Sequence, residues 1–241
     1  MIICFAAVLV GFLASYAFKE KIFDFLSIPL VASLPEDNSW MVFTGVTEAF
    51  FTYLKTSFLA GFFLSLPVIF YQLWLFISPG LYGKEKKLIA PFVIFSTLFF
   101  VTGASFGYFV VFPFGFQFLM GFASETIRPF PSLREYLSFA TKLLLAFGLV
   151  FELPLVSYFL SRAGLLTYQT LARNRRYFLV LAFVAAAALT PPDVVTQLLM
   201  AGPLILLFEL SVQVARIFGK PPLTDKEGEL LDEEEPRHPA G

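Results

Sequence analysis

The stretch LLLAFGLVFELPLVSYFL, residues 143–160, contains one charged residue, Glu152, and otherwise only uncharged side chains. The nearest charges, Lys142 and Arg162, each lie ten residues from Glu152, which is about 15 Å along an α-helix. Because the hydrocarbon core of a bilayer is about 30 Å thick, a helix that crosses a membrane here carries this carboxyl group near the midplane. Ionisable side chains at that depth are costly and are functional by default. The stretch therefore predicts a membrane-spanning helix with a functional acid at its centre.

The composition of the whole chain is that of an integral membrane protein. Hydrophobic residues fill 58% of the 241 positions, charged residues fill 15%, and the mean hydropathy is +0.78; a soluble domain carries about 25% charged residues. The only histidine is His238 and the only cysteine is Cys4. This excludes a histidine-containing catalytic triad, a His-ligated metal site and an intramolecular disulfide. With no phosphate-binding glycine loop and no basic–aromatic surface for nucleic acid in the sequence, we expect neither an enzyme nor a cofactor-binding protein.

Uncharged runs predict an all-α fold with six transmembrane helices in one membrane domain, residues 1–218. The expected spans are residues 2–18, 57–77, 88–111, 134–161, 177–189 and 194–218, and the acidic segment 219–241 is expected to be a disordered tail. Pro113 is expected to end the third helix near Val111, with FGFQFLMGF then lying along the membrane interface. At the start of the fourth helix, Ser132 and Glu135 form a capping-box pattern.

The basic residues predict the orientation. They are Lys84, Lys86 and Lys87 after the second expected span, Arg162, Arg173, Arg175 and Arg176 after the fourth, and Arg216 and Lys220 after the sixth. Cytoplasmic loops carry an excess of lysine and arginine. Both termini are therefore expected in the cytoplasm.

The fifth expected span is short. As a helix, residues 177–189 extend for about 20 Å, roughly 10 Å less than a normal hydrocarbon core. A mismatch of this size must thin the bilayer or be shielded by protein.

Several polar residues leave structural and functional interpretations open. Glu152 either hydrogen-bonds another helix of the same protein or faces a watery cavity or a polar partner. Pro154 favours function, because it removes the hydrogen bond to the Val150 carbonyl and kinks the helix beside the acid. Gln197 is expected to share a polar cavity with Glu152, while Asp193 either caps the sixth helix or belongs to a functional outer turn.

Four long segments together resemble the TatC family, the multi-spanning receptor subunit of the twin-arginine protein translocase. They follow the family's order through nearly the whole chain and are SLPVIFYQLWLFISPGLYGKEKKL (65–88), GYFVVFPFGFQFL (107–119), AFGLVFELPLV (146–156) and LTPPDVVTQLLMAGPLILLFE (189–209). The resemblance implies a curved six-helix structure whose last two helices are short. It also implies export of folded proteins across the bacterial cytoplasmic membrane, driven by the proton gradient.

The resemblance further implies residue roles and partners. Glu85 and Phe76, with Gln72 close by, correspond to the positions that bind the twin-arginine signal peptide at the cytoplasmic face. A carboxylate at Glu85 suits this role, because the planar guanidinium group of a signal-peptide arginine can pair with it through two parallel hydrogen bonds.

Inside the membrane, single-span subunits of the TatA and TatB type are expected to dock against a cavity, in a larger complex that self-associates and contacts lipid. The corresponding positions are Glu152 with Pro154, Gln197, and the outer turn of Pro191, Pro192 and Asp193.

One departure and two rival functions stay open. Family members begin with a segment of the form His-Leu-x-Glu-Leu-Arg, whereas this sequence starts with MIICFAAVLV; either the start is truncated or misassigned, or the signal is bound weakly. The chief rival is a proton-coupled secondary transporter of a small solute that uses Glu152. The absence of a second Glu-x-Pro pattern in the first half counts against the internal repeat that such transporters usually have. A membrane scaffold without transport activity is the other rival.

Overall fold

The structure, a computed structural model, describes residues 2–34, 41–42, 45–77, 89–122, 130–189 and 193–219. Among these residues every regular element is a helix, apart from one isolated β-bridge between Val42 and Ser132, which confirms the all-α prediction. The helices are α1 (Ile2–Tyr16), α2 (Lys19–Val31), α3 (Glu48–Ile77), α4 (Ile89–Phe106), a π-helical segment (Gly107–Val111), α5 (Phe112–Met120), α6 (Leu133–Phe151), α7 (Leu153–Arg162), α8 (Tyr168–Arg173), α9 (Arg175–Leu189) and α10 (Val194–Phe218).

Within the part of the chain that the structure describes, four helical stretches are long and apolar enough to cross a membrane. They are Glu48–Phe76, Ala90–Met120, Leu133–Arg162 and Val194–Phe218. The pair α1 and α2, bent by 88°, is a fifth candidate if it forms one broken span. Helix α9 is too short for this group: its 15 residues extend for about 22 Å, so the predicted shortness holds although the helix begins at Arg175 rather than Tyr177. The resemblance implied that the last two helices are both short. Helix α9 is short, whereas α10 has 25 residues and is not. The count of six spans stays a prediction.

The prediction that Pro113 ends a helix near Val111 is wrong. Helix α4, the π-helical segment and α5 form one candidate span that continues to Met120, so FGFQFLMGF extends this helix instead of leaving it. The N–H of Phe112 donates to the carbonyl of Gly107, five residues back, and Pro113 occupies the first turn of α5. A helix tolerates proline in its first turn, because the N–H groups there have no intrahelical acceptor in any case. The wider π turn allows α5 to begin a new first turn in line with α4.

The capping box predicted at the start of α6 is also wrong. Ser132 does occupy the position before the helix, but its side chain makes no capping bond to α6. Its hydroxyl donates instead to Glu48 Oε1 at 2.8 Å, and the backbone N–H of Arg134 donates to the same oxygen at 2.9 Å. A carboxylate from α3 therefore satisfies the N-terminus of α6, where free N–H groups and the helix dipole favour a negative charge.

Helix α2 is tied to the neighbouring helices by two tyrosines. Pro29 lies inside α2, and because it has no N–H it leaves the carbonyl of Phe25 without its helical donor. The hydroxyl of Tyr108 donates to this carbonyl, and the hydroxyl of Tyr136 donates to the next one, that of Leu26. Both bonds join segments distant in the sequence, so the π-helical segment and α6 are fastened to α2.

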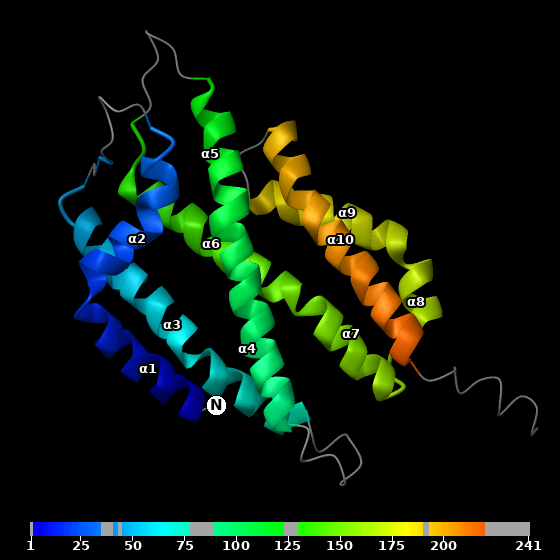
Figure 1. The fold of residues 1–241 in the computed structure, drawn as a ribbon. Helices are drawn as coiled ribbons and strands as arrows, with labels where there is room; N and C mark the ends of the chain where they lie inside the picture. The colour runs from blue at the N-terminus through cyan, green and yellow to red at the C-terminus, as the bar shows by residue number, and fades with distance from the viewer. Residues whose placement is uncertain are drawn as a thin grey trace, which may run out of the picture.

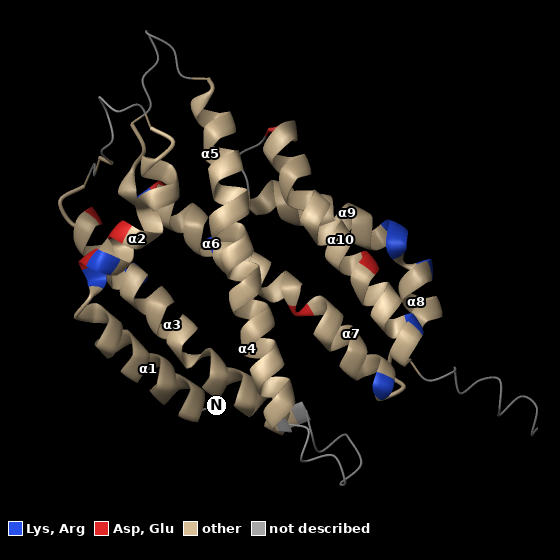
Figure 2. Cartoon of the chain, in the orientation of Figure 1, with Lys and Arg blue, Asp and Glu red and all other residues tan. Residues whose placement is uncertain are grey.

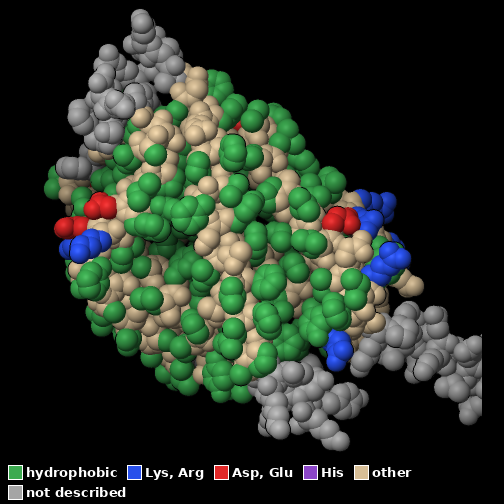
Figure 3. Space-filling model, in the orientation of Figure 1, with side chains coloured by type: hydrophobic (Ala, Val, Ile, Leu, Met, Phe, Trp, Pro, Cys, Tyr) green, Lys and Arg blue, Asp and Glu red, His purple; other side chains and the backbone are tan. Residues whose placement is uncertain are grey.

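The helices stand side by side and their ends gather at two opposite edges (Figure 1). The start of α1 and the C-terminal ends of α3, α7 and α10 lie toward one edge, while α2, the end of α5 and the start of α10 lie toward the other. In Figure 2, charged residues cluster at the junction of α1 and α2 and around α8 with the adjoining ends of α9 and α10. Figure 3 shows apolar side chains over nearly the whole visible face, with charges at its margins. Such an extended apolar surface is suited to lipid rather than water.

Candidate functional site: a buried acid at a helix break

Glu152 lies where one membrane-spanning helix is interrupted. It ends α6 and precedes α7, with backbone angles of φ −73° and ψ −18°. Its N–H donates to the carbonyl of Leu149, three residues back, at 3.1 Å, and its own carbonyl accepts from the N–H of Val156 at 2.8 Å. Pro154 sits in the first turn of α7, where its missing N–H removes one bond of the regular α-helical ladder. The helix is therefore interrupted beside the acid, and the predicted kink at this place stays a prediction.

The side chain of Glu152 is 5% exposed and one of its oxygens is unsatisfied. Among the residues that the structure describes, Oε1 has no hydrogen-bond partner. The polar groups that approach the carboxyl come from α4 and are the side chain of Ser96 and the backbone of Phe100. The Ser96 hydroxyl in turn accepts a hydrogen bond of 2.9 Å from Trp74 Nε1 on α3, and both side chains are buried. The acid therefore belongs to a polar cluster that joins α3, α4 and the break between α6 and α7.

Two glycines bring α4 close enough to cover the acid. A Cβ atom added to Gly103 would lie 2.5 Å from the backbone oxygen of Phe147, and one added to Gly148 would lie 2.5 Å from the ring of Phe100. Real Cβ atoms do not approach so closely, so α4 and α6 pack at a distance that larger residues would prevent. This contact places the Ser96 face of α4 against Glu152.

A groove lies beside the break, on the side of Pro154. Its volume is about 560 Å³, and α4, α7 and α10 form its walls. The side chains are apolar except for a tyrosine hydroxyl and one arginine at the end of α7, and those from α4 and α7 include Phe92, Phe95, Phe99, Pro154, Leu155, Tyr158, Phe159 and Arg162. An elongated apolar partner such as a transmembrane helix matches this lining in polarity.

Gln197 and Asp193 make their described bonds within the α9–α10 hairpin. Gln197 Nε2 donates to the carbonyl of Phe183 on α9 at 3.0 Å. Asp193 Oδ1 accepts from the backbone N–H of Thr196 at 2.7 Å, and the Thr196 hydroxyl donates to the other oxygen of the same carboxylate. Asp193 thus caps α10. The described contacts do not bring Gln197 to Glu152, whose polar neighbours are on α4, and Pro191 and Pro192 lie outside the described residues.

The residues expected to bind a signal peptide are described only in part. Phe76 lies one residue before the end of α3 and is 84% exposed, and Gln72, one helical turn earlier, is half-buried. Glu85 lies outside the described residues. An exposed aromatic ring at a helix end suits contact with a partner, and the assignment of all three residues stays a prediction.

Sequence reasoning missed the neighbours that define the site. Trp74 and Ser96 stand in long apolar runs, where no periodicity distinguishes the face of α4 that meets Glu152. Glu48 was likewise not considered, although it organises the start of α6. Another acid, Glu209, places its carboxylate 3.0 Å from Arg175 across the α9–α10 hairpin.

Comparison with known proteins gives a consistent result. The family model described as "Sec-independent protein translocase protein (TatC)" matches residues 1–203. The protein of that name from Desulforapulum autotrophicum is 56% identical over 223 residues, which cover 92% of this chain and 82% of that protein. The one from Escherichia coli is 42% identical over 215 residues, covering 89% and 83%.

A solved structure agrees with these relatives. The structure titled "Crystal Structure of Twin Arginine Translocase Receptor- TatC" superposes with a TM-score of 0.80 at 40% identity and covers 90% of this chain and 94% of that one. The resemblance inferred from the four segments is therefore confirmed. The chain belongs to the TatC family of Sec-independent protein translocase proteins.

Proposed function

We propose that this chain is the receptor and core subunit of a twin-arginine translocase in a bacterial cytoplasmic membrane. It binds the twin-arginine signal peptides of folded proteins and assembles with single-span TatA- and TatB-type subunits, and the proton gradient drives export. The observation that carries the proposal is the match to the solved TatC receptor, with a TM-score of 0.80 at 40% identity over 90% of the chain. Membership of a family of translocase components does not favour the alternative of a small-solute transporter using Glu152.

Both termini lie in the cytoplasm in this proposal. Its support is that the start of α1 and the ends of α3, α7 and α10 share one edge (Figure 1). Basic residues follow those helix ends in the sequence, while none lies between α9 and α10. The positive-inside rule assigns that edge to the cytoplasm.

Signal binding takes place at this cytoplasmic edge. Glu85 receives the arginine pair of the signal, and Phe76 and Gln72 contact the residues beside it. The 84% exposure of Phe76 at the end of α3 supports this role, as does the strength of charge-assisted hydrogen bonds between a carboxylate and a guanidinium fork.

Partner docking takes place at Glu152, with Pro154, Gln197 and the turn of Pro191, Pro192 and Asp193 shaping the surrounding surface. Its support is that Glu152 Oε1 has no hydrogen-bond partner among the described residues, and that Pro154, two residues further on, lines an apolar groove. A polar side chain on an incoming helix would satisfy the carboxyl group. Hydrogen bonds of this kind contribute about 0.6–2 kcal/mol in a membrane, which suits reversible docking.

The decisive experiment is export of a folded reporter by bacteria whose only TatC protein is this chain, produced with TatA and TatB subunits of a close relative. We expect the reporter in the periplasm when its signal carries two arginines and in the cytoplasm when both are lysines. Failure of the arginine signal with the complex present at normal abundance would refute the receptor role. Proton-driven uptake of a small solute by proteoliposomes containing the chain alone would instead support the transporter.

A further inference from the structure

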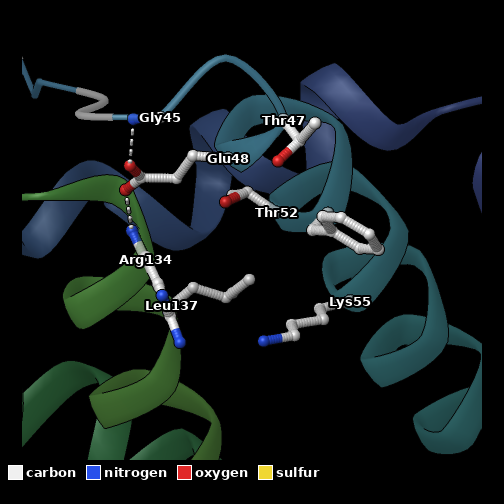
Figure 4. Close-up of a pocket in the computed structure, with 8 residues that line it drawn as sticks. Gly45, Thr47, Glu48, Thr52, Lys55, Arg134 and Leu137 are labelled. Atoms are coloured by element: carbon white, nitrogen blue, oxygen red, sulfur yellow. Dashed lines mark hydrogen bonds between the residues drawn. The ribbon is translucent and has the colours of Figure 1, made fainter.

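A second cavity lies between the first turns of α3 and α6, at the opposite edge from the proposed signal site. Its volume is about 390 Å³. The lining combines polar and apolar side chains and includes Thr47, Glu48, Phe51, Lys55, Arg134 and Leu137 (Figure 4). Neither the family's name nor the proposed function assigns a role to it.

Two cations share this cavity. In Figure 4 the ammonium group of Lys55 and the guanidinium group of Arg134 extend toward one another, the first from α3 and the second from α6. Both residues are exposed, and within the described part of the chain neither has an ion pair. Like charges that face one another repel. An anion placed between them would remove this repulsion and contact both.

Glu48 holds the cavity in shape and leaves it with an excess of positive charge. Its carboxylate accepts hydrogen bonds from the backbone N–H of Gly45 at 3.2 Å, the hydroxyl of Ser132 at 2.8 Å and the backbone N–H of Arg134 at 2.9 Å. These bonds fix the backbone of Arg134 relative to α3. Among the described residues that line it, the cavity thus has a fixed frame, two cations and one carboxylate that is already hydrogen-bonded.

The position of Lys55 places the cavity at the boundary of the membrane. The run Thr56–Ile77 that follows is uncharged, and as a helix it extends for about 33 Å, close to the thickness of the hydrocarbon core. Lys55 therefore lies at the depth of the lipid headgroups. The rings and methyl groups of Phe51 and Leu137, which add apolar surface to the lining, suit the glycerol and first methylene groups of a lipid rather than a free ion.

We propose that this cavity binds the headgroup of an anionic membrane phospholipid. The ammonium of Lys55 and the guanidinium of Arg134 contact the phosphate oxygens, the Thr47 hydroxyl adds a hydrogen bond, and Phe51 and Leu137 lie along the glycerol. A lipid bound in this way bridges α3 and α6 on the membrane side of the Glu48 contact.

The test is native mass spectrometry of the purified full chain in detergent with phosphatidylglycerol, and with phosphatidylcholine of the same acyl chains. We expect one tightly retained phosphatidylglycerol. Lys55→Gln and Arg134→Gln should each lower its affinity about fivefold, the usual contribution of one basic residue at an anionic membrane. Lys55→Arg should retain most of it. Lys21→Gln is the matched control, because Lys21 is an exposed lysine on α2 that does not line the cavity.

Each other outcome overturns the proposal. If the double variant Lys55→Gln/Arg134→Gln binds phosphatidylglycerol as tightly as the unaltered chain, the lipid binds elsewhere. If Lys21→Gln lowers the affinity as much as Lys55→Gln does, the lipid responds to the general surface charge and not to this cavity. Equal retention of phosphatidylcholine removes the preference for anionic lipid. Displacement of the lipid by millimolar inorganic phosphate identifies a site for soluble anions. Unchanged thermal unfolding of the lipid-free variants confirms that they are folded.

Discussion

At the residue scale, the carboxyl group of Glu152 depends on interactions from outside its own helix. A charged carboxylate near the bilayer centre costs about 2.5–3.5 kcal/mol on insertion scales. Ser96 and the backbone of Phe100 approach the group, yet Oε1 stays without a partner among the described residues. A hydrogen bond from a partner subunit would therefore stabilise an atom that the described residues leave unsatisfied.

The first prediction tests this docking role by substitution. Glu152→Gln keeps a hydrogen-bonding side chain of the same shape, whereas Glu152→Ala removes it. We expect crosslinking of a TatA- or TatB-type helix beside residue 152 to fall about three- to thirtyfold in the Ala variant, and less in the Gln variant. Site-specific crosslinking and export rate, measured on the same membranes, check this. A proton-coupling role predicts the same complete loss of export for both variants with unchanged crosslinking, and that result would end the docking proposal.

The second prediction concerns the signal site. Glu85→Ala removes the only acid of the loop KEKK. Because hydrogen bonds to charged groups contribute about 1.5–3 kcal/mol, the twin-arginine signal should bind about ten- to a hundredfold more weakly. Lys86→Ala, which leaves the carboxylate in place, is the control and should have a smaller effect. Photo-crosslinking of a signal peptide at rising concentration gives the affinities. Unchanged binding by the Glu85→Ala variant in an intact complex contradicts the assignment.

At the element scale, hydropathy located the helices, but tertiary contacts determined their ends. Two prolines inside long candidate spans had opposite effects on the helix. The helix is interrupted at Glu152, two residues before Pro154, whereas before Pro113 a π turn rearranges the hydrogen bonds and the helix continues. The sequence predicted a helix end near Val111, which is absent, and a kink beside Glu152, where the regular helix is interrupted. Whether neighbouring turns can adjust depends on packing, and a local pattern carries no information on it.

The same limit explains the start of α6. Ser132 and Glu135 fit a local capping motif, yet the bonds are made to Glu48, 84 residues earlier than Ser132. Local motifs describe what a segment can do by itself. A buried carboxylate brought in by another helix is a stronger acceptor than the local alternative, because hydrogen bonds to charged groups are the strong ones.

The third prediction concerns the contact between α4 and α6. In Gly103→Ala the new methyl group would overlap the backbone oxygen of Phe147, so the helices must separate at a cost of about 1–3 kcal/mol. Gly202→Ala is the matched control, since nothing lies within 4 Å of its added Cβ and alanine is the better helix former by about 1 kcal/mol. Thermal unfolding in detergent should show a lower midpoint for the first and an equal or higher midpoint for the second. Equal midpoints would mean that the close approach is not needed for stability.

At the scale of the whole molecule, the sequence identified the family but left the membrane arrangement incomplete. Four ordered segments were enough to indicate TatC, because each combines turn residues, prolines and polar positions at fixed spacing. The number of spans is harder to obtain, because α1 and α9 have only 15 residues each. For such helices, crossing depends on how the bilayer adapts, which neither hydropathy nor helix length determines.

The fourth prediction follows from the short helix α9. Helix α9 extends for about 22 Å, whereas the candidate span Ala90–Met120 has 31 residues. The bilayer should therefore be thinner near Asp193, between α9 and α10, than beside α4 and α5. Electron microscopy in lipid nanodiscs should show this depression on the outer face. A flat bilayer of uniform thickness around the molecule would mean that protein shields the ends of α9.

The crossing of α2 over its neighbours has a mechanical consequence. Its carbonyl groups at Phe25 and Leu26 are latched by the hydroxyls of Tyr108 and Tyr136, and α2 also leans on α3 and α5. Because α2 is bound at several points, it resists separation of the helices that it contacts, and these helices pivot about that region. When the long helices tilt relative to one another, their atoms therefore move least where they contact α2. The movement grows along each helix with distance from α2 and is largest at the C-terminal ends of α3 and α7, at the opposite edge.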